Sequence, residues 1–133
     1  MYYIEPEVPG QLGDSTVLDT SVHPPIVHKL HFRFYGWLGD DLIECFPVFL
    51  VSEKLKDALL KSNLSGFEIA ACEIEVDEQL RILQPGLTIP DFYWLKIPGD
   101  ADDDFAFINS KLKVSEMALK FLSDFNIKNA DIT

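Results

Sequence analysis

A segment of nineteen residues in the middle of the chain recurs near its end, and this repeat limits the folds open to the chain. Residues 51–69 align without gaps with residues 114–132, and six of the nineteen pairs are identical. Each copy predicts the same order of structure, namely a strand, a helix and a second strand. Helix start, helix end and following strand agree in one register, so we interpret the repeat as an internal duplication. Convergence of two similar capped helices is the alternative interpretation.

The helix within each copy is defined by its end signals. Ser52 and Ser115 are typical N-cap residues, because a serine hydroxyl accepts a hydrogen bond from a free amide of the first turn. The glutamate after each serine places a negative charge at the positive end of the helix dipole. Asn63 and its aligned residue Asn126 follow the last helical residues. We expect this asparagine to take the left-handed conformation that ends many helices.

The remaining segments favour strands and turns. Leu30, Phe32 and Phe34 alternate with polar residues, as in a half-buried strand, and residues 92–97 are a further strand candidate. Residues 1–27 are rich in turn-forming residues, so we expect an extended N-terminal arm followed by a single domain over residues 28–133. The predicted fold class is α+β, with an antiparallel or mixed sheet and two principal helices on one face.

The chain is strongly acidic. Its 133 residues include 22 Asp and Glu against 11 Lys and Arg, which gives a formal net charge of −11. Such a surface repels phosphate backbones and anionic lipids, so we expect neither nucleic-acid nor membrane binding. A basic protein is the partner that this charge favours, although acidity also serves solubility alone. A homodimer through an exposed sheet edge is a further alternative.

Cellular location is predicted from the cysteines and the apolar runs. Cys45 and Cys72 are not closely paired, as is typical of buried thiols in a reducing compartment. The first residues lack the basic and apolar regions of a secretory signal, and no apolar run is long enough for a membrane helix. We therefore expect a cytoplasmic protein.

Two acidic segments are candidates for a contact surface. The first is a glycine-rich turn with two aromatic residues beside it, and the second is an acidic loop before residue 105. Aromatic side chains ringed by acids are typical of protein interfaces, whereas large aromatics are just as often core residues. The predicted contact residues are Tyr35, Trp37, Asp40, Asp41, Asp100, Asp102, Asp103 and Asp104.

The sequence assigns no catalytic residue, cofactor or metal ligand. The alternating acids of residues 100–104 resemble the start of a calcium loop, but Phe105 and Lys111 stand where that loop needs glycine and glutamate. Phosphate-binding glycine loops and nucleophile motifs are absent. The alternative function is a small metal-dependent hydrolase that uses carboxylates of Asp40, Asp41 or the acidic loop.

Around the paired Val-Ser-Glu segments the chain resembles small bacterial proteins related to the immunity proteins of polymorphic toxin systems. The similarity covers residues 35–41, 46–69, 92–97 and 114–132. The resemblance implies a cytoplasmic antidote that binds and blocks a cognate toxin without catalysis, and many such toxins are basic nucleases. No binding residue is carried over, because the shared residues are caps and core. We therefore expect a non-enzymatic, acidic protein-binding module.

Overall fold

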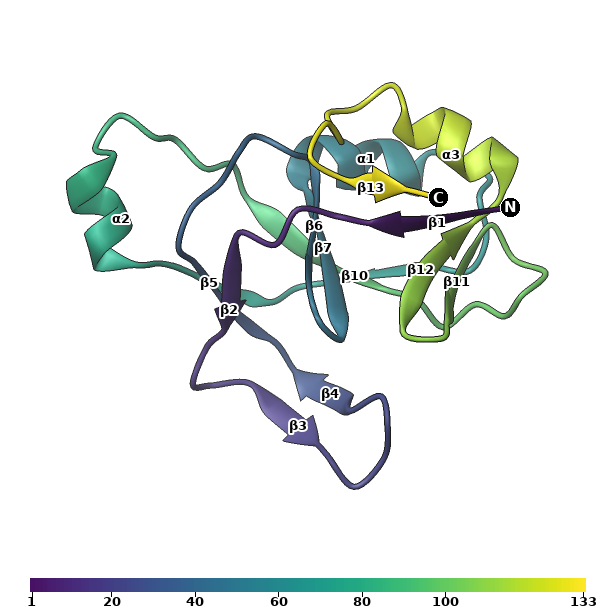
Figure 1. The fold of residues 1–133 in the computed structure, drawn as a ribbon, viewed down its shortest axis with the longest axis horizontal. Helices are drawn as coiled ribbons and strands as arrows, with labels where there is room; N and C mark the ends of the chain where they lie inside the picture. The colour runs from purple at the N-terminus through teal and green to yellow at the C-terminus, as the bar shows by residue number, and fades with distance from the viewer.

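The computed structural model describes all residues from Met1 to Thr133 and confirms the α+β class (Figure 1). No helix has the length and apolar character that crossing a bilayer requires. The helices are α1 (Glu53–Leu60), α2 (Glu78–Leu83) and α3 (Glu116–Leu122). The strands are β1 (Tyr2–Glu5), β2 (Gly10–Leu12), β3 (Val17–Asp19), β4 (Ile26–Lys29), β5 (His31–Phe34), β6 (Leu42–Cys45), β7 (Val48–Ser52), β8 (Glu68–Ala70), β9 (Glu73–Val76), β10 (Phe92–Lys96), β11 (Phe105–Ile108), β12 (Lys111–Val114) and β13 (Asp131–Ile132).

Two four-stranded sheets have the same strand order and the same register. One sheet has the order β6-β7-β10-β8 and the other β11-β12-β1-β13, and all their pairings are antiparallel. In the two hairpins Leu42 pairs with Val51 and Phe105 pairs with Val114, which is again an offset of 63 residues. Each hairpin leads into a helix capped by serine, with the Ser52 hydroxyl bonded to the Leu55 amide and the Ser115 hydroxyl to the Ala118 amide. The two copies therefore adopt like structures, as the duplication predicts.

The first strand of each repeat lies in the sheet of the other repeat. In chain order β1 comes before the β6–β7 hairpin, yet it pairs with β12, with Tyr2 opposite Val114. Strand β10 comes before the β11–β12 hairpin, yet it pairs with β7, with Tyr93 opposite Val51. The two repeats are thus intertwined by an exchange of strands, and neither four-stranded sheet forms from one repeat alone.

Residues 1–27 are not an extended arm. Strand β1 lies between β12 and β13, and Ile4 is in the main core. Strand β2 pairs with β5, and β3 pairs with β4 in a hairpin that projects from the body of the protein (Figure 1). Proline and glycine occupy the turns between these short strands. Their frequency led to the prediction of an extended arm instead of strands.

The duplication extends into the loops before the hairpins. Residues 36–41 and 99–104 occupy equivalent positions and share Gly36 with Gly99, Asp40 with Asp103, and Asp41 with Asp104. The backbone hydrogen bonds are also equivalent, because Ser52 donates to the Asp41 carbonyl and Ser115 donates to the Asp104 carbonyl, each over 2.9 Å. The two acidic segments of the predicted contact surface are therefore two copies of one loop.

The last aspartate of each loop joins the two repeats. Asp41 accepts a hydrogen bond from the Ser52 hydroxyl at 2.7 Å and from the Asn126 amide at 2.9 Å. Asp104 accepts from the Ser115 hydroxyl at 2.6 Å and from the Ser65 amide at 2.9 Å. Each carboxylate thus fixes the helix cap of its own repeat and the loop after the helix of the other. We call these two arrangements the aspartate clasps.

The expected left-handed conformation is absent at both asparagines, because the positive-φ residues other than glycine are Asn109 and Ser110. The Ser62 hydroxyl instead donates to the carbonyl of Leu59 at the end of α1. Asn126 is held by its contacts with the first repeat, through its amide to Asp41 and through its side chain to the carbonyl of Gly39. At Asn126 these tertiary contacts therefore fix the chain after the helix, in place of the left-handed conformation expected from the sequence.

One of the two four-stranded sheets is buried on both of its faces, and the other is buried on only one face. One face of the β6-β7-β10-β8 sheet joins α1, α3 and the second sheet in the main core, and its other face is covered by β5 and α2. All five residues of β7 are buried, consistent with its unbroken apolar run. In β12, Lys111 and Lys113 stand where β7 has Val48 and Leu50, and burial alternates along the strand. The inserted segments β5 and α2 thus bury the second face of one sheet, whereas the other sheet has no such cover.

We expect the two clasps to differ in their contribution to stability. Asp41→Ala should reduce the free energy of unfolding by about 2–4 kcal/mol, because it leaves the Ser52 hydroxyl and the Asn126 amide without a buried acceptor. Asp104→Ala should cost about 1 kcal/mol, because the carboxylate is only half-buried and water can replace it. Urea unfolding at pH 7 measures both, with Asp102→Ala as the exposed control. An Asp104→Ala loss equal to that of Asp41→Ala would contradict this account.

Candidate functional site

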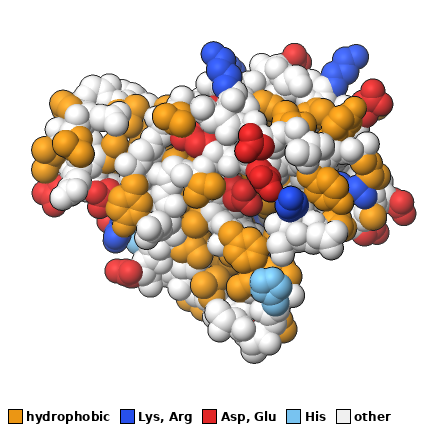
Figure 2. Space-filling view, in the orientation of Figure 1, with side chains coloured by type: hydrophobic (Ala, Val, Ile, Leu, Met, Phe, Trp, Pro, Cys, Tyr) orange, Lys and Arg blue, Asp and Glu red, His pale blue; other side chains and the backbone are white.

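An open pocket of about 1040 Å³ lies where the end of β1 crosses the β6–β7 hairpin. We call it the acidic groove, because four carboxylates and one lysine line it. Figure 2 shows carboxylates gathered at the middle of this face. The lining consists of residues 4–11, residues 35–38, Glu44, residues 109–111, Asn129 and Asp131.

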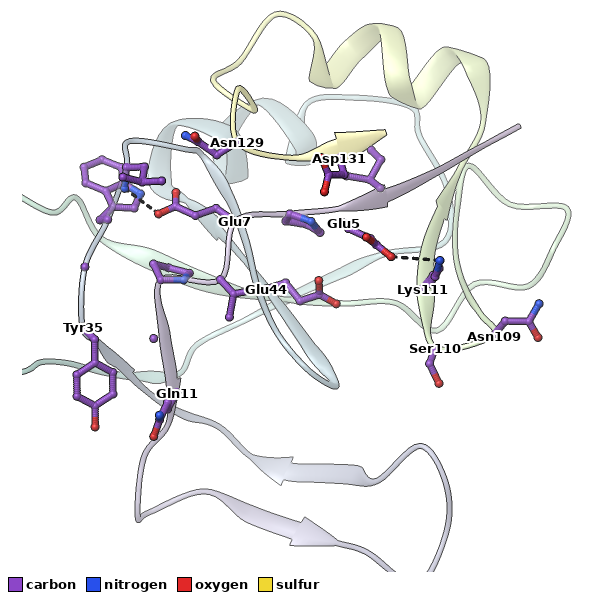
Figure 3. A pocket seen from close by; sticks show the side chains of 18 residues that line it. Glu5, Glu7, Gln11, Tyr35, Glu44, Asn109, Ser110, Lys111, Asn129 and Asp131 are labelled. Carbon is purple, nitrogen blue, oxygen red and sulfur yellow. Dashed lines mark hydrogen bonds and ion pairs between the residues drawn. The ribbon is translucent and has the colours of Figure 1, made fainter. Parts of the chain in front are cut away.

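Glu44 is a carboxylic acid of this groove that has no basic residue paired with it. It is a half-buried residue of β6, and burial raises its pKa to about 7, with a further contribution from the charge of Glu5. Figure 3 shows Glu5 and Glu44 in the same part of the groove, with the Glu5 carboxylate directed to Lys111. Lys111 forms an ion pair with Glu5 at 3.1 Å, but none of the ion pairs of the protein includes Glu44. The groove therefore has one cation for two neighbouring acids.

Glu7 places a second carboxylate without a cation in the same wall. Its side chain is 7% exposed, and its Oε2 accepts a hydrogen bond from the Leu38 amide at 2.7 Å (Figure 3). Oε1 is buried and has no hydrogen-bond partner, although the nearby Asp40 amide favours the charged form. Burial is the largest influence and raises the pKa of Glu7. A buried acceptor without a hydrogen-bond partner reduces the stability of the folded protein.

Exposed apolar and aromatic residues form the rim of the acidic groove. Leu38 is 71% exposed, Val8 is 63% exposed and Tyr35 is 44% exposed. Trp37 is half-buried, with its ring against Phe92 and its Nε1 bonded to the carbonyl of Asp40. Apolar side chains around a charged pocket are a composition that protein interfaces use. The sequence-predicted residues Tyr35 and Trp37 thus lie at the groove.

The structure corrects the predicted role of Asp40 and Asp41. Asp40 is 0% exposed and accepts hydrogen bonds from the amide and the side chain of Asn129. Asp41 is 9% exposed and belongs to a clasp. Both carboxylates therefore act inside the protein, and neither is available as a contact surface. The sequence pattern could not separate them from surface acids, because their partners lie more than eighty residues away.

The acidic loop lies outside the acidic groove. Asp100 and Asp102 are exposed, and Asp103 and Asp104 are half-buried and bonded within the loop or to Ser65. The prediction that this loop contacts a partner therefore stays a prediction. The structure brings no three His, Cys, Asp or Glu side chains together in an arrangement that could hold a metal ion.

The predicted contact residues did not include Glu5, Glu7 or Glu44, although Glu44 was noted beside Asp40 and Asp41 as a possible acid for catalysis. One signal was present, since Glu44 interrupts the apolar run from Leu42 to Val51. An acid in a strand that is otherwise buried is either paired or functional, and this one is not paired. Glu5 and Glu7 gave no comparable signal, because they stand among the prolines of the first residues.

Comparison with models of protein families, with curated proteins and with solved structures gave no match to this chain. What the groove binds is therefore inferred from its chemistry. The carboxylate of Glu44, which has no paired cation, favours a positively charged ligand, because a cation at hydrogen-bond distance stabilises its ionised form. The apolar rim favours a ligand that also carries apolar surface.

The raised pKa of Glu44 predicts a change of stability with pH. The unfolded residue ionises near pH 4.5 and the folded one near pH 7, so the folded protein binds the proton more tightly and loses stability as the pH rises between these values. Glu44→Gln should therefore be only slightly more stable than the parent at pH 5, where most of the loss has not yet occurred, and more stable by about 1–2 kcal/mol at pH 8, allowing for partial solvation. Urea unfolding at both pH values measures this difference. The same difference at pH 5 and pH 8 would contradict the prediction.

Proposed function

We propose that this protein is a non-enzymatic binding module that takes a basic protein partner at the acidic groove. The observation that carries the proposal is the carboxylate of Glu44, which has no paired basic residue, in a groove with an exposed apolar rim. A partner with a basic side chain among apolar neighbours would satisfy both features. The net charge of −11 adds long-range attraction for such a partner.

The resemblance to immunity proteins of polymorphic toxin systems suggests what the partner is. In that interpretation the protein is a cytoplasmic antidote, and the partner is a cognate toxin of the kind that includes basic nucleases. Binding at an acidic groove would block such a toxin without any reaction. The exposed acids Asp100 and Asp102 would be an auxiliary contact on the other copy of the loop.

The alternative of a metal-dependent hydrolase has less support from the molecule. Asp40 and Asp41 use their carboxylate oxygens for internal hydrogen bonds. The acids of residues 100–104 are not gathered around a common point that could hold an ion. We therefore do not propose it.

Co-expression tests the proposed function. The toxin encoded by the gene directly upstream is expressed with or without this protein, and growth is measured. We expect the parent chain to restore growth and to form a complex with the toxin. Glu44→Lys should abolish rescue and weaken the complex by at least about 30-fold, because it places a positive charge against the basic side chain. Circular dichroism and thermal unfolding show that the variant is folded.

Two further variants locate the contact. Glu78→Lys, an exposed position on α2 outside the groove, makes the same change of charge and should retain rescue. Asp102→Lys places that change on the acidic loop. Loss of rescue in Asp102→Lys with full rescue in Glu44→Lys would move the contact from the groove to the loop and contradict the proposal. Absence of rescue by the parent chain would contradict the binding function itself.

A further inference from the structure

A second pocket, which we call the apolar pocket, occupies the position in one repeat that the acidic groove occupies in the other. It has a volume of about 430 Å³ and is lined by the end of β10, the start of β7, part of β8 and residues 24–27. Phe107 stands here where the acidic groove has Glu44, because the two hairpins are equivalent at an offset of 63 residues. Apolar walls therefore replace the acids, and the two pockets share no lining residue.

Exposed apolar side chains stand beside the apolar pocket. Ile26, a residue of its wall, is 48% exposed, and Phe46, in the turn between β6 and β7, is 43% exposed. The ring centroid of Phe46 lies 6.1 Å from that of His23 and 6.5 Å from that of Phe107, so Phe46 connects the β3–β4 hairpin with the pocket. Figure 2 shows hydrophobic side chains gathered over this hairpin. Apolar side chains that project beside an apolar hollow are typical of a surface that another protein covers.

The charges that line the apolar pocket are balanced, in contrast to those of the whole chain. Glu68 and Lys96 are the charged residues of the lining, both are exposed, and no ion pair of the protein includes either of them. They lie opposite one another on β8 and β10, and the amine of Lys96 lies over the ring of Trp94 at 4.7 Å. A face with one unpaired acid and one unpaired base is complementary to a second copy of itself, because a two-fold axis can bring each charge to its opposite.

We propose that the apolar pocket is the contact of a homodimer with two-fold symmetry, in which Phe46 of each copy packs into the apolar pocket of the other and Lys96 faces Glu68. Two copies that each carry a net charge of −11 repel one another over most of their surfaces, so they associate best where acids are few. A basic toxin, by contrast, gains no attraction from a face of balanced charge. Because the apolar pocket and the acidic groove share no lining residue, this inference does not rest on the proposed function.

Sedimentation velocity of the full chain from about 1 to 500 μM, without any toxin, tests the inference. We expect a monomer–dimer equilibrium within this range of concentration. Phe46→Asp and Ile26→Asp should each weaken the dimer at least about ten-fold, because each places an unpaired charge in an apolar contact. Leu83→Asp makes the same kind of change at an exposed apolar position of α2 and should dimerise like the parent. Circular dichroism shows that each variant is folded.

An exchange of charges tests how the two copies face one another. Lys96→Glu and Glu68→Lys should each weaken self-association at least about three-fold, because like charges then lie across the contact. An equimolar mixture of these two variants should form a heterodimer about as stable as the parent dimer, because every facing pair is again of opposite sign. Thermal unfolding of each variant alone shows that the loss of association is not a loss of fold.

Three results would overturn the homodimer. The first is a parent chain that remains monomeric at the highest concentration. The second is a dimer that Phe46→Asp and Ile26→Asp leave intact, which would assign the contact to another surface. The third is a mixture of the two charge variants that associates no better than either variant alone. A monomeric parent whose Phe46→Asp variant no longer rescues growth would also overturn it and assign this face to the toxin.

Discussion

The buried carboxylate of Asp41 joins the two halves of the protein, because one of its oxygens holds the cap of α1 and the other holds the loop after α3. Asp104 makes the reverse connection from the second repeat. Together with the exchanged strands β1 and β10, these clasps make each repeat complete only in the presence of the other. The relative position of the two hairpins, and hence of the groove between β1 and β6, depends on this connection.

The two repeats differ because additional strands and a helix are inserted between the repeated elements of the first one. The strands β2 to β5 follow β1, and β9 with α2 follows β8, so both additions fall in the first repeat, before β10. They cover the second face of one sheet and part of the apolar pocket. The other sheet keeps lysines on its uncovered face, and the equivalent pocket keeps its acids. The two repeats thus carry two equivalent pockets, a larger acidic one and a smaller apolar one.

The repeat, the helices and most strands could be predicted because their signals are local. A serine cap, an apolar stripe and an alternating strand are each written within a few residues, and Ser52, Ser115 and the strand over residues 92–96 follow them. The exchange of strands could not be predicted, since local pattern does not say which hairpin a strand joins. The same limit explains Asp40 and Asp41, whose burial depends on partners at Asn126 and Asn129. Glu5 and Glu7 become a site only when β1 crosses Glu44.

We propose that the acidic groove, rather than the total charge of the protein, selects the partner. Hydrogen exchange of the protein in complex with the proposed toxin partner is the most direct test of this proposal. We predict protection of the amides in residues 5–11, 35–38 and 109–111, with the exposed β3–β4 hairpin unchanged. Protection of the hairpin or of residues 100–104, with none in the groove, would contradict it.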